Sequence, residues 1–343
     1  MCRRLLRFLL FLLSIVYALT IRLRNFCYDR ELLKTYQAAI PVISVGNITT
    51  GGTGKTPLVI WIYNLLQQKG LKCAILTRGY KSGQGKLTDE PAILAKSCPE
   101  ASIIVNPDRV AGAEKAVSEF GANVIVMDDG FQHRRLRRDL DIIAIDATCP
   151  FGYGRLLPAG LLREPAGSIE RADAAVITRY DQADDDSIAE TKKRIEEIAP
   201  DITVANAVHK HPCAKAIKGE PIGIEQLSGK TIYVFCGIGN PDAFLQRLNE
   251  FGSNIAGSRI YNDHHNYTAQ DISDIYEEAR YLNAEIILST EKDWIKTALL
   301  WRKDENILFA YLAVELEFVS GTDIIEALVD RTVNKEQVKG RDV

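Results

Sequence analysis

Residues 41–57 read PVISVGNITTGGTGKTP and place three signals in a row. Residues 41–45 form an apolar run of strand length, residues 51–56 form a glycine-rich loop that ends in Lys-Thr, and residues 57–69 carry apolar side chains on one helical face. Glycine lets the backbone turn its N–H groups inward, and the amino terminus of the following helix adds positive potential. This strand–loop–helix unit therefore predicts a phosphate-binding loop (P-loop).

The loop departs from the usual P-loop pattern at one point. That pattern has glycine five residues before Gly54, where this chain has Thr49, and two adjacent glycines supply the flexibility instead. We expect ATP to lie against Thr49, Thr50, Gly51, Gly52, Thr53, Gly54, Lys55 and Thr56. In this interpretation Lys55 reaches the β- and γ-phosphates and Thr56 holds Mg²⁺. The alternative is a glycine-rich turn that binds no ligand.

Two adjacent carboxylates follow another apolar run. Residues 123–127 (NVIVM) lead into Asp128 and Asp129. A carboxylate at the carboxyl end of a buried parallel strand is where Mg²⁺ is held beside a P-loop, so we expect Asp128 first, and Asp129 second, to bind it. The alternative is an ordinary strand-end turn through Gly130.

Short apolar strands alternate with helical segments on both sides of these motifs. Further strands are expected at 73–76, 102–105, 141–145 and 174–178, helices at 109–120 and 184–200, and a second strand–helix series from 231. Such alternation predicts parallel βαβ units whose sheet is covered on both faces. The predicted fold class is α/β: a P-loop NTPase-like parallel-sheet domain, a second, smaller α/β domain and an N-terminal membrane-associated helix.

The predicted domain boundaries follow changes in this pattern. Residues 1–38 are the N-terminal helix and its connector, and residues 39–208 are the P-loop domain. Weak periodicity with several Gly and Pro makes 209–229 a linker. The smaller domain spans 230–333, and 334–343 is a polar tail that is expected to fray.

The amino terminus carries an uncharged run, FLLFLLSIVYALTI at 8–21, with three arginines before it and two just after it. As a helix the run spans about 21 Å, which is less than the roughly 30 Å hydrocarbon core of a bilayer. We therefore favour a helix that lies at an anionic membrane surface over one that spans it. Arginines directly after the run argue against a cleaved signal peptide. A buried helix of a soluble protein is the remaining alternative.

Composition excludes other classes of protein. Of 343 residues, 46% are hydrophobic and 25% are charged, which fits a globular protein of about two domains. The net charge of −3 gives no basic field, so no nucleic-acid partner is predicted. The seven cysteines are odd in number and include no C-x-x-C pair, which argues against a disulfide framework or a zinc site. No obligate protein partner is inferred.

Two polar segments are candidates for proton transfer. Asp108 follows an apolar strand, and residues 261–265 read YNDHH. A histidine and an aspartate that act together can take the proton of an attacking hydroxyl. From spacing alone the simpler interpretation is favoured, in which Asp108 caps the following helix and His264 is a surface histidine. The four arginines at 134–138, after His133, are either a solvated face or a site for an anionic substrate.

Six segments together resemble a known family. They are GNITTGGTGKTP (46–57), LTRGY (76–80), MDDGFQHR (127–134), LLPAGLLREP (156–165), DHH (263–265) and TEKD (290–293). The set resembles tetraacyldisaccharide 4'-kinase, the lipid A 4'-kinase of Gram-negative bacteria, from the N-terminal helix to about residue 297. DDGFQHR and LREP are much more specific than the loop alone.

The resemblance implies a reaction and its partners. The γ-phosphate of ATP would pass, with Mg²⁺ present, to the 4'-hydroxyl of tetraacyldisaccharide 1-phosphate, giving lipid IVA in lipid A biosynthesis. The acylated disaccharide and the inner membrane surface would be the partners, and the enzyme would work at the cytoplasmic face.

The resemblance also implies roles for single residues. It assigns the nucleotide and Mg²⁺ to Lys55, Thr56, Asp128 and Asp129, and the catalytic pair to Asp108 and His264, with His265 as the alternative histidine. Glu164 is a further candidate Mg²⁺ ligand. Arg163, Asp263 and His133 are expected to bind or support the substrate.

Two other functions compete with this one. GGTGKT also resembles the loop of membrane-bound switch NTPases of the MinD/ParA type, which carry a lysine immediately before the paired glycines, where this chain has Thr50. A small-molecule ATP-dependent ligase on a P-loop scaffold would leave the N-terminal apolar helix unexplained.

Overall fold

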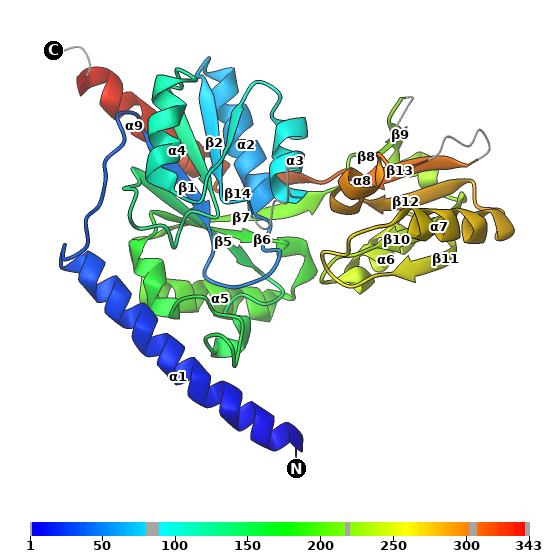
Figure 1. Cartoon of the computed structure of the whole chain (residues 1–343), viewed down its shortest axis with the longest axis horizontal. Coiled ribbons are helices and arrows are strands. Elements are labelled where there is room, and N and C mark those ends of the chain that lie inside the picture. Colours follow the sequence, from blue (N-terminus) through cyan, green and yellow to red (C-terminus); the bar gives the residue numbers. More distant parts are fainter. Residues whose placement is uncertain (1, 80–88, 217–219, 302–306, 340–343) are drawn as a thin grey trace. The chain divides into compact units, whose positions relative to one another are not determined.

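The computed structural model describes residues 2–79, 89–216, 220–301 and 307–339, and the chain divides into two compact units (Figure 1). Met1–His209 and Leu316–Val343 form the first, here called the P-loop unit. Lys210–Glu315 form the second unit. Both are layered α/β structures, as the sequence predicts.

An eight-stranded sheet forms the centre of the P-loop unit. Its strands are β1 (Val42–Gly46), β2 (Cys73–Thr77), β3 (Ser102–Val105), β4 (Val124–Asp128), β5 (Leu140–Asp146), β6 (Ala174–Thr178), β7 (Thr203–Lys210) and β14 (Glu315–Ser320). They lie in the order β14-β7-β6-β5-β1-β4-β2-β3, and every pair from β7 to β3 is parallel. Parallel pairing places the carboxyl ends of β1, β4 and β2 at one edge, where open α/β sheets bind ligands.

Helices cover both faces of this sheet, which is why its strands are continuous apolar runs (Figure 1). On one face pack α2 (Lys55–Gln68), α3 (Asp89–Ser97) and α9 (Thr322–Lys339), and on the other α4 (Arg109–Ser118) and α5 (Asp185–Ile198). In β4, Val126 contributes to the core under α2, and Met127 to the core under α4. The predicted strands agree with β1 to β6 to within one residue at each end.

The second unit contains a six-stranded sheet in the order β11-β10-β12-β13-β8-β9. The strands are β8 (Cys213–Ala216), β9 (Ile222–Gly223), β10 (Thr231–Cys236), β11 (Asn254–Ile260), β12 (Ile286–Thr290) and β13 (Leu308–Leu312). The helices are α6 (Pro241–Glu250), α7 (Ala269–Tyr281) and α8 (Glu291–Thr297). β10 to β13 are parallel, so the loops after β10, β11 and β12 share one edge, and β8 is antiparallel to both of its neighbours.

The structure differs from the predicted domain boundaries at two places. Residues 209–229, predicted as a linker, contain β8 and β9, which complete the second sheet. Residues after 315, predicted to belong to the smaller domain and a frayed tail, return to the P-loop unit as β14 and α9. Ile325 and Val329 of α9 are fully buried in the core under α2. Long-range return of a chain to an earlier domain leaves no local signal in sequence, and strands as short as β9 have little periodicity to detect.

The N-terminal helix α1 spans Cys2–Asp29, twice the length of its uncharged run. Twenty-eight residues make a helix of about 42 Å. Within Leu5–Asp29 an 18-residue window has a mean hydropathy of 2.0 and is only 11% buried, and by length and composition the segment is long and apolar enough to cross a membrane. The helix as a whole is thus longer than its uncharged run, and its length and composition also allow it to cross a membrane.

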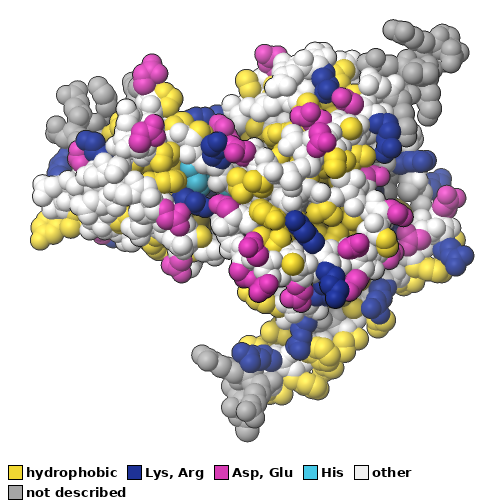
Figure 2. Space-filling view, turned by 180° about the vertical axis from the view of Figure 1, so that it is seen from behind, with side chains coloured by type: hydrophobic (Ala, Val, Ile, Leu, Met, Phe, Trp, Pro, Cys, Tyr) yellow, Lys and Arg dark blue, Asp and Glu magenta, His cyan; other side chains and the backbone are white. Residues whose placement is uncertain are grey.

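The exposed side of α1 is its apolar side. Eleven large hydrophobic side chains between Leu5 and Leu23 are exposed: Leu5, Leu6, Phe8, Leu9, Phe11, Leu12, Leu13, Ile15, Val16, Leu19 and Leu23. They cover the helix with hydrophobic surface in Figure 2. An ordinary amphipathic helix of a soluble protein turns its apolar face inward, and a contiguous exposed apolar face of this kind marks an interaction site.

Candidate active site

The P-loop lies between β1 and α2, as predicted. Gly51 and Gly54 take left-handed backbone angles, with φ of 105° and 79°. At Gly54 a side chain would also collide with His209, since a Cβ would come within 2.6 Å of its Nε2. Gly54 is the N-cap of α2 and no described side chain caps this helix, so its first N–H groups are available to an anion.

Several hydrogen bonds hold the loop in this shape. The Asn47 side-chain amide donates to the Thr53 hydroxyl at 3.0 Å and to the Thr49 carbonyl at 2.7 Å. The Thr178 hydroxyl, at the end of β6, donates to the Thr53 carbonyl at 2.9 Å. Arg179 donates to the Gly52 carbonyl at 2.7 Å. Sequence reasoning missed Asn47, Thr178 and Arg179, because their role depends on which strand ends lie beside the loop.

Lys55 and the second carboxylate of the acidic pair form an ion-pair cluster with Arg163. The Lys55 ammonium lies 3.4 Å from Asp129 Oδ1. Arg163 Nη1 donates to both carboxylate oxygens of Asp129, at 2.9 and 2.8 Å. Burial raises the pKa of Asp129, but the two cations outweigh that effect and hold this pKa below its usual value. Arg163 thus orients the Asp129 carboxylate.

Asp128 lies in a different environment from its neighbour. Its side chain is buried at the end of β4 and accepts a hydrogen bond from the Thr77 hydroxyl at 3.2 Å. Burial, and next the charge of Asp129, raise the pKa of Asp128 to about 6. The two carboxylates therefore have pKa values displaced in opposite directions, an arrangement that is frequent at functional sites.

The residues present fit ATP and Mg²⁺. The uncapped N–H groups of α2 and the Lys55 ammonium are phosphate donors, and the Thr56 hydroxyl and the acidic pair are the oxygen ligands that Mg²⁺ prefers. Mg²⁺ at a phosphate site needs only one or two carboxylates.

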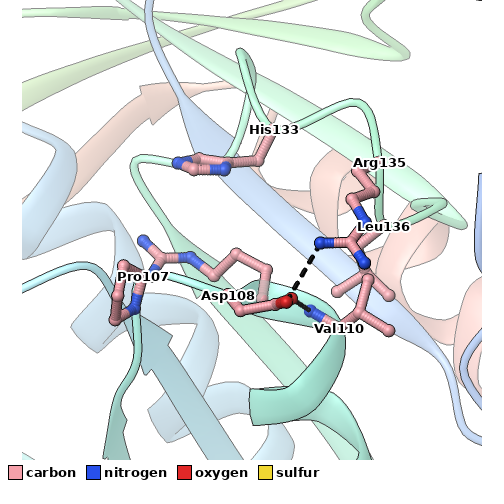
Figure 3. Close-up of a pocket in the computed structure, with 7 residues that line it drawn as sticks. Pro107, Asp108, Val110, His133, Arg135 and Leu136 are labelled. Atoms are coloured by element: carbon pink, nitrogen blue, oxygen red, sulfur yellow. Dashed lines mark hydrogen bonds and ion pairs between the residues drawn. The ribbon is translucent and has the colours of Figure 1, made fainter. Parts of the chain in front are cut away.

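Asp108 borders a pocket of about 210 Å³ in the P-loop unit (Figure 3). One carboxylate oxygen caps α4 through the N–H groups of Val110 and Ala111, and the other accepts from Arg135 at 3.0 Å. The helix N–H groups, helped by Arg135, lower the pKa of Asp108 against the opposing effect of burial. The capping role that the residue types allowed is therefore present, together with an ion pair.

His133 and Arg109 line the same pocket (Figure 3). Arg109 is buried and donates to the carbonyls of Asn106 and Asp128. Burial lowers the pKa of Arg109 to about 10. Burial, and next the charge of Arg109, lower the pKa of His133 to about 4, so His133 is neutral at physiological pH. Arg135 and Arg109 give the pocket the cationic character that an anionic substrate requires.

Packing separates the two adjacent histidines of the second unit. The His265 ring stacks on Tyr261 with centroids 4.4 Å apart, and its Nε2 lies 3.3 Å from an Asp271 carboxylate oxygen. His264 has a positive φ of 61°, and its side chain is 58% exposed. Its Nε2 lies 3.3 Å from the Lys292 ammonium and 3.8 Å from Asp263. His264 is therefore the more exposed of the two histidines, while His265 is packed against Tyr261 and beside Asp271.

Comparisons with known proteins show the family of this chain. The family profile described as tetraacyldisaccharide-1-P 4'-kinase (LpxK) matches residues 6–334. A relative named tetraacyldisaccharide 4'-kinase from Syntrophus aciditrophicus is 37% identical, covering 84% of each chain. One of the same name from Anaeromyxobacter sp. (strain Fw109-5) is 33% identical, covering 93% of this chain and 89% of its own.

This chain belongs to the tetraacyldisaccharide 4'-kinase family. A solved structure of the family, LpxK from Aquifex aeolicus described as an "apo" form in complex with ATP, has a TM-score of 0.74 and 29% identity. It covers 96% of this chain and 99% of its own, so the fold is shared across both units. The predicted family, fold class and kinase activity are thereby confirmed.

One 4'-kinase motif residue that sequence reasoning left without a role is Asp293 of TEKD. Its side chain is fully buried at the edge shared by three loops of the second unit. It accepts hydrogen bonds from the Gly237 N–H at 3.0 Å, the Tyr267 hydroxyl at 2.9 Å and the Thr290 hydroxyl at 2.6 Å. The Gly237 carbonyl in turn accepts from the His264 N–H at 3.2 Å, so Asp293 holds the loop that carries His264.

The other residue that the structure reinterprets is Glu164 of LREP. Its carboxylate is fully buried and accepts from Arg171 at 2.9 Å and from Asn25 of α1 at 3.0 Å, with Arg24 at 3.6 Å. These partners are cations and an amide donor, unlike the oxygen-rich surroundings of a Mg²⁺ site. In this structure the buried Glu164 carboxylate is paired with Arg171 and Arg24. The prediction that it binds Mg²⁺ does not follow from this position.

Proposed function

We propose that this chain transfers the γ-phosphate of ATP to the 4'-hydroxyl of tetraacyldisaccharide 1-phosphate, producing lipid IVA and ADP. The observation that carries the proposal is the Lys55–Asp129–Arg163 cluster beside the uncapped amino terminus of α2, in a chain of the 4'-kinase family. Phosphoryl transfer needs little covalent chemistry from the protein, so positioned cations and N–H donors supply most of the catalysis.

The P-loop unit is assigned the nucleotide. The N–H groups of residues 51–56 and the Lys55 ammonium hold the phosphates, and Lys55 stabilises the charge that develops on the transferred group. Thr56 and the acidic pair would hold Mg²⁺, which supplies further neutralisation of phosphate charge when bound. Arg163 keeps Asp129 directed at this site through its paired hydrogen bonds.

Proton removal from the acceptor is assigned to Asp108 and His264. In the transfer, the 4'-oxygen forms a bond to the γ-phosphorus while the bond to the bridging oxygen of ADP breaks, and the hydroxyl proton leaves to a base. A neutral imidazole is an appropriate base near pH 7. The family motif supports this pairing, and the exposure of His264 supports the choice of histidine.

The lipid acceptor is proposed to reach the enzyme through α1. An acylated disaccharide stays in the bilayer, so its kinase has to work at that surface. The exposed apolar face of α1, with arginines at both ends, suits the cytoplasmic face of the inner membrane, either lying in its interface or crossing it. A membrane-bound switch NTPase has less support, because Thr50 stands where its signature lysine belongs and donates to the Leu161 carbonyl at 3.3 Å.

A direct assay tests the proposal. The purified full chain is incubated with γ-labelled ATP, Mg²⁺ and tetraacyldisaccharide 1-phosphate in mixed micelles, with Lys55→Met as the matched control. We expect the label in a bisphosphorylated lipid for the wild type and a rate lower by two or more orders of magnitude for Lys55→Met. Label released only as inorganic phosphate would support the switch NTPase instead.

A further inference from the structure

The face of α1 that packs on the P-loop unit carries several polar side chains beside one buried apolar one. Ser14, Tyr17, Arg24 and Asn25 lie on this face with Ile21, and Ser14 and Ile21 are buried. Ile21 supplies apolar packing, and the polar side chains add specific hydrogen bonds that hold the helix in place. Those bonds lead from α1 to the P-loop by two routes.

The first route passes through the neighbouring residues Arg163 and Glu164. The Tyr17 hydroxyl donates to the Arg163 carbonyl at 2.9 Å, and the Asn25 side-chain amide donates to a Glu164 carboxylate oxygen at 3.0 Å. The Arg163 guanidinium then holds Asp129, whose carboxylate lies 3.4 Å from the Lys55 ammonium. Tyr17 thus fixes the backbone of Arg163, and Asn25 fixes the side chain of its neighbour Glu164. Arg163 is the residue that orients the ion-pair cluster.

The burial of Glu164 makes its contacts with α1 important for the position of this segment. Glu164 has no exposed surface, and Arg171 is its other hydrogen-bond donor, at 2.9 Å. A buried carboxylate is costly unless its partners stay in place, so displacement of Asn25 or Arg24 disturbs the whole 163–164 segment.

The second route begins at Arg24. Its Nη2 donates to the Gln132 carbonyl at 2.8 Å, and the Gln132 side-chain amide donates to the Asn47 carbonyl at 2.9 Å. The Asn47 amide in turn bonds to Thr53 in the P-loop at 3.0 Å. Arg24 is therefore connected to the P-loop through Gln132 and Asn47, by a route that does not include the ion-pair cluster.

We propose that Tyr17, Arg24 and Asn25 are positioning residues for the nucleotide site, so that the helix assigned to the membrane also sets the geometry of the P-loop and of Lys55. The inference rests on the proposed function, because the benefit of such coupling is a nucleotide site that is well ordered when the helix is seated at the lipid surface. These residues act through Arg163 and Asn47 and do not touch ATP themselves.

The test separates nucleotide geometry from membrane binding. Tyr17→Phe removes one hydroxyl and keeps the helix surface, and Asn25→Ala removes the amide; Thr20→Ala is the control, because the Thr20 hydroxyl bonds only within α1, to the Val16 carbonyl, in the described contacts. We expect Mg-ATP affinity and kcat to fall about two- to tenfold in Tyr17→Phe and about tenfold in Asn25→Ala. Sedimentation with anionic phospholipid vesicles should stay at the wild-type level in all three variants.

A double variant tests the route. If Asn25 acts through the 163–164 segment, Asn25→Ala lowers kcat much less in an Arg163→Ala background than in the wild type. Wild-type Mg-ATP affinity and kcat in both Tyr17→Phe and Asn25→Ala, or loss of vesicle binding alone, would overturn the inference. Failure of the wild type to phosphorylate the lipid would instead remove the proposed function, while the Mg-ATP affinities would still decide whether the helix positions the site.

Discussion

Replacing Asp128 by Asn should make the protein more stable and much less active. Asp128 is buried at the end of β4, and burial raises its pKa from 3.8 to about 6. An increase of about two pH units corresponds to about 3 kcal/mol at 1.36 kcal/mol each. That free energy is the cost of keeping the carboxylate ionised in the folded protein without a bound cation.

The sign of the pH dependence follows from the raised pKa. Well below pH 3.8 the carboxyl is protonated in both folded and unfolded chains and costs nothing. As pH rises towards 6 the unfolded chain ionises first, so the wild type loses stability, and above pH 6 the full cost remains. Asp128→Asn carries no charge, and its amide oxygen still accepts the hydrogen bond from Thr77. The stability advantage of Asp128→Asn should therefore grow by about 2 kcal/mol between pH 4.5 and pH 7.5.

The measurement is urea unfolding with EDTA present at the two pH values. Trp61 on α2 reports on the P-loop unit when Trp294 and Trp301 are replaced by Phe in every protein compared. Asp201→Asn is the control, because Asp201 is exposed in the turn before β7. Equal or lower stability of Asp128→Asn at pH 7.5 would refute the reasoning that burial dominates at this carboxylate. In the kinase assay the same variant should lose most of its activity, since the amide is a poor Mg²⁺ ligand.

Three further outcomes follow from the site. Lys55→Met should lower kcat by two or more orders of magnitude while the urea midpoint changes little, and near-normal turnover would remove the P-loop assignment. His264→Ala should lower kcat more than it weakens Mg-ATP binding. His265→Ala should mainly lower the unfolding temperature, because His265 packs between aromatic rings. The opposite pattern would reverse the choice of histidine. Arg171→Met should destabilise the protein by about 3–5 kcal/mol in urea unfolding, because the buried Glu164 carboxylate then lacks one of its cations. The double variant Arg171→Met, Glu164→Gln should recover most of that loss.

Local signals in the sequence were sufficient for the P-loop and for most of its sheet. Buried parallel strands are continuous apolar runs, and a glycine-rich loop followed by Lys-Thr has few other uses, so β1 to β6 and α2 were predicted almost to the residue. The acidic pair was also placed correctly, because a parallel strand that pairs with β1 has to end beside the P-loop.

Contacts between distant segments had no such signal. Glu164 was predicted to be a metal ligand because it belongs to LREP, a family motif near the nucleotide. In the folded chain its carboxylate is surrounded by Arg171, Asn25 and Arg24 instead. Sequence patterns also could not predict that β14 and α9 return to the first unit. Nor could they distinguish the environments of His264 and His265, since these depend on what each side chain packs against in the folded chain.

The sequence by itself determined the parts of this protein: a phosphate loop, an acidic pair and an apolar N-terminal helix, each encoded within a dozen or so consecutive residues. Only the tertiary structure decided how these parts act on one another. Burial sets the pKa of Asp128 apart from that of Asp129, and the polar side of α1 bonds to the segment that orients Lys55. The physical reason is that local conformation follows from neighbouring residues, whereas burial and charge pairing follow from residues that only folding brings together.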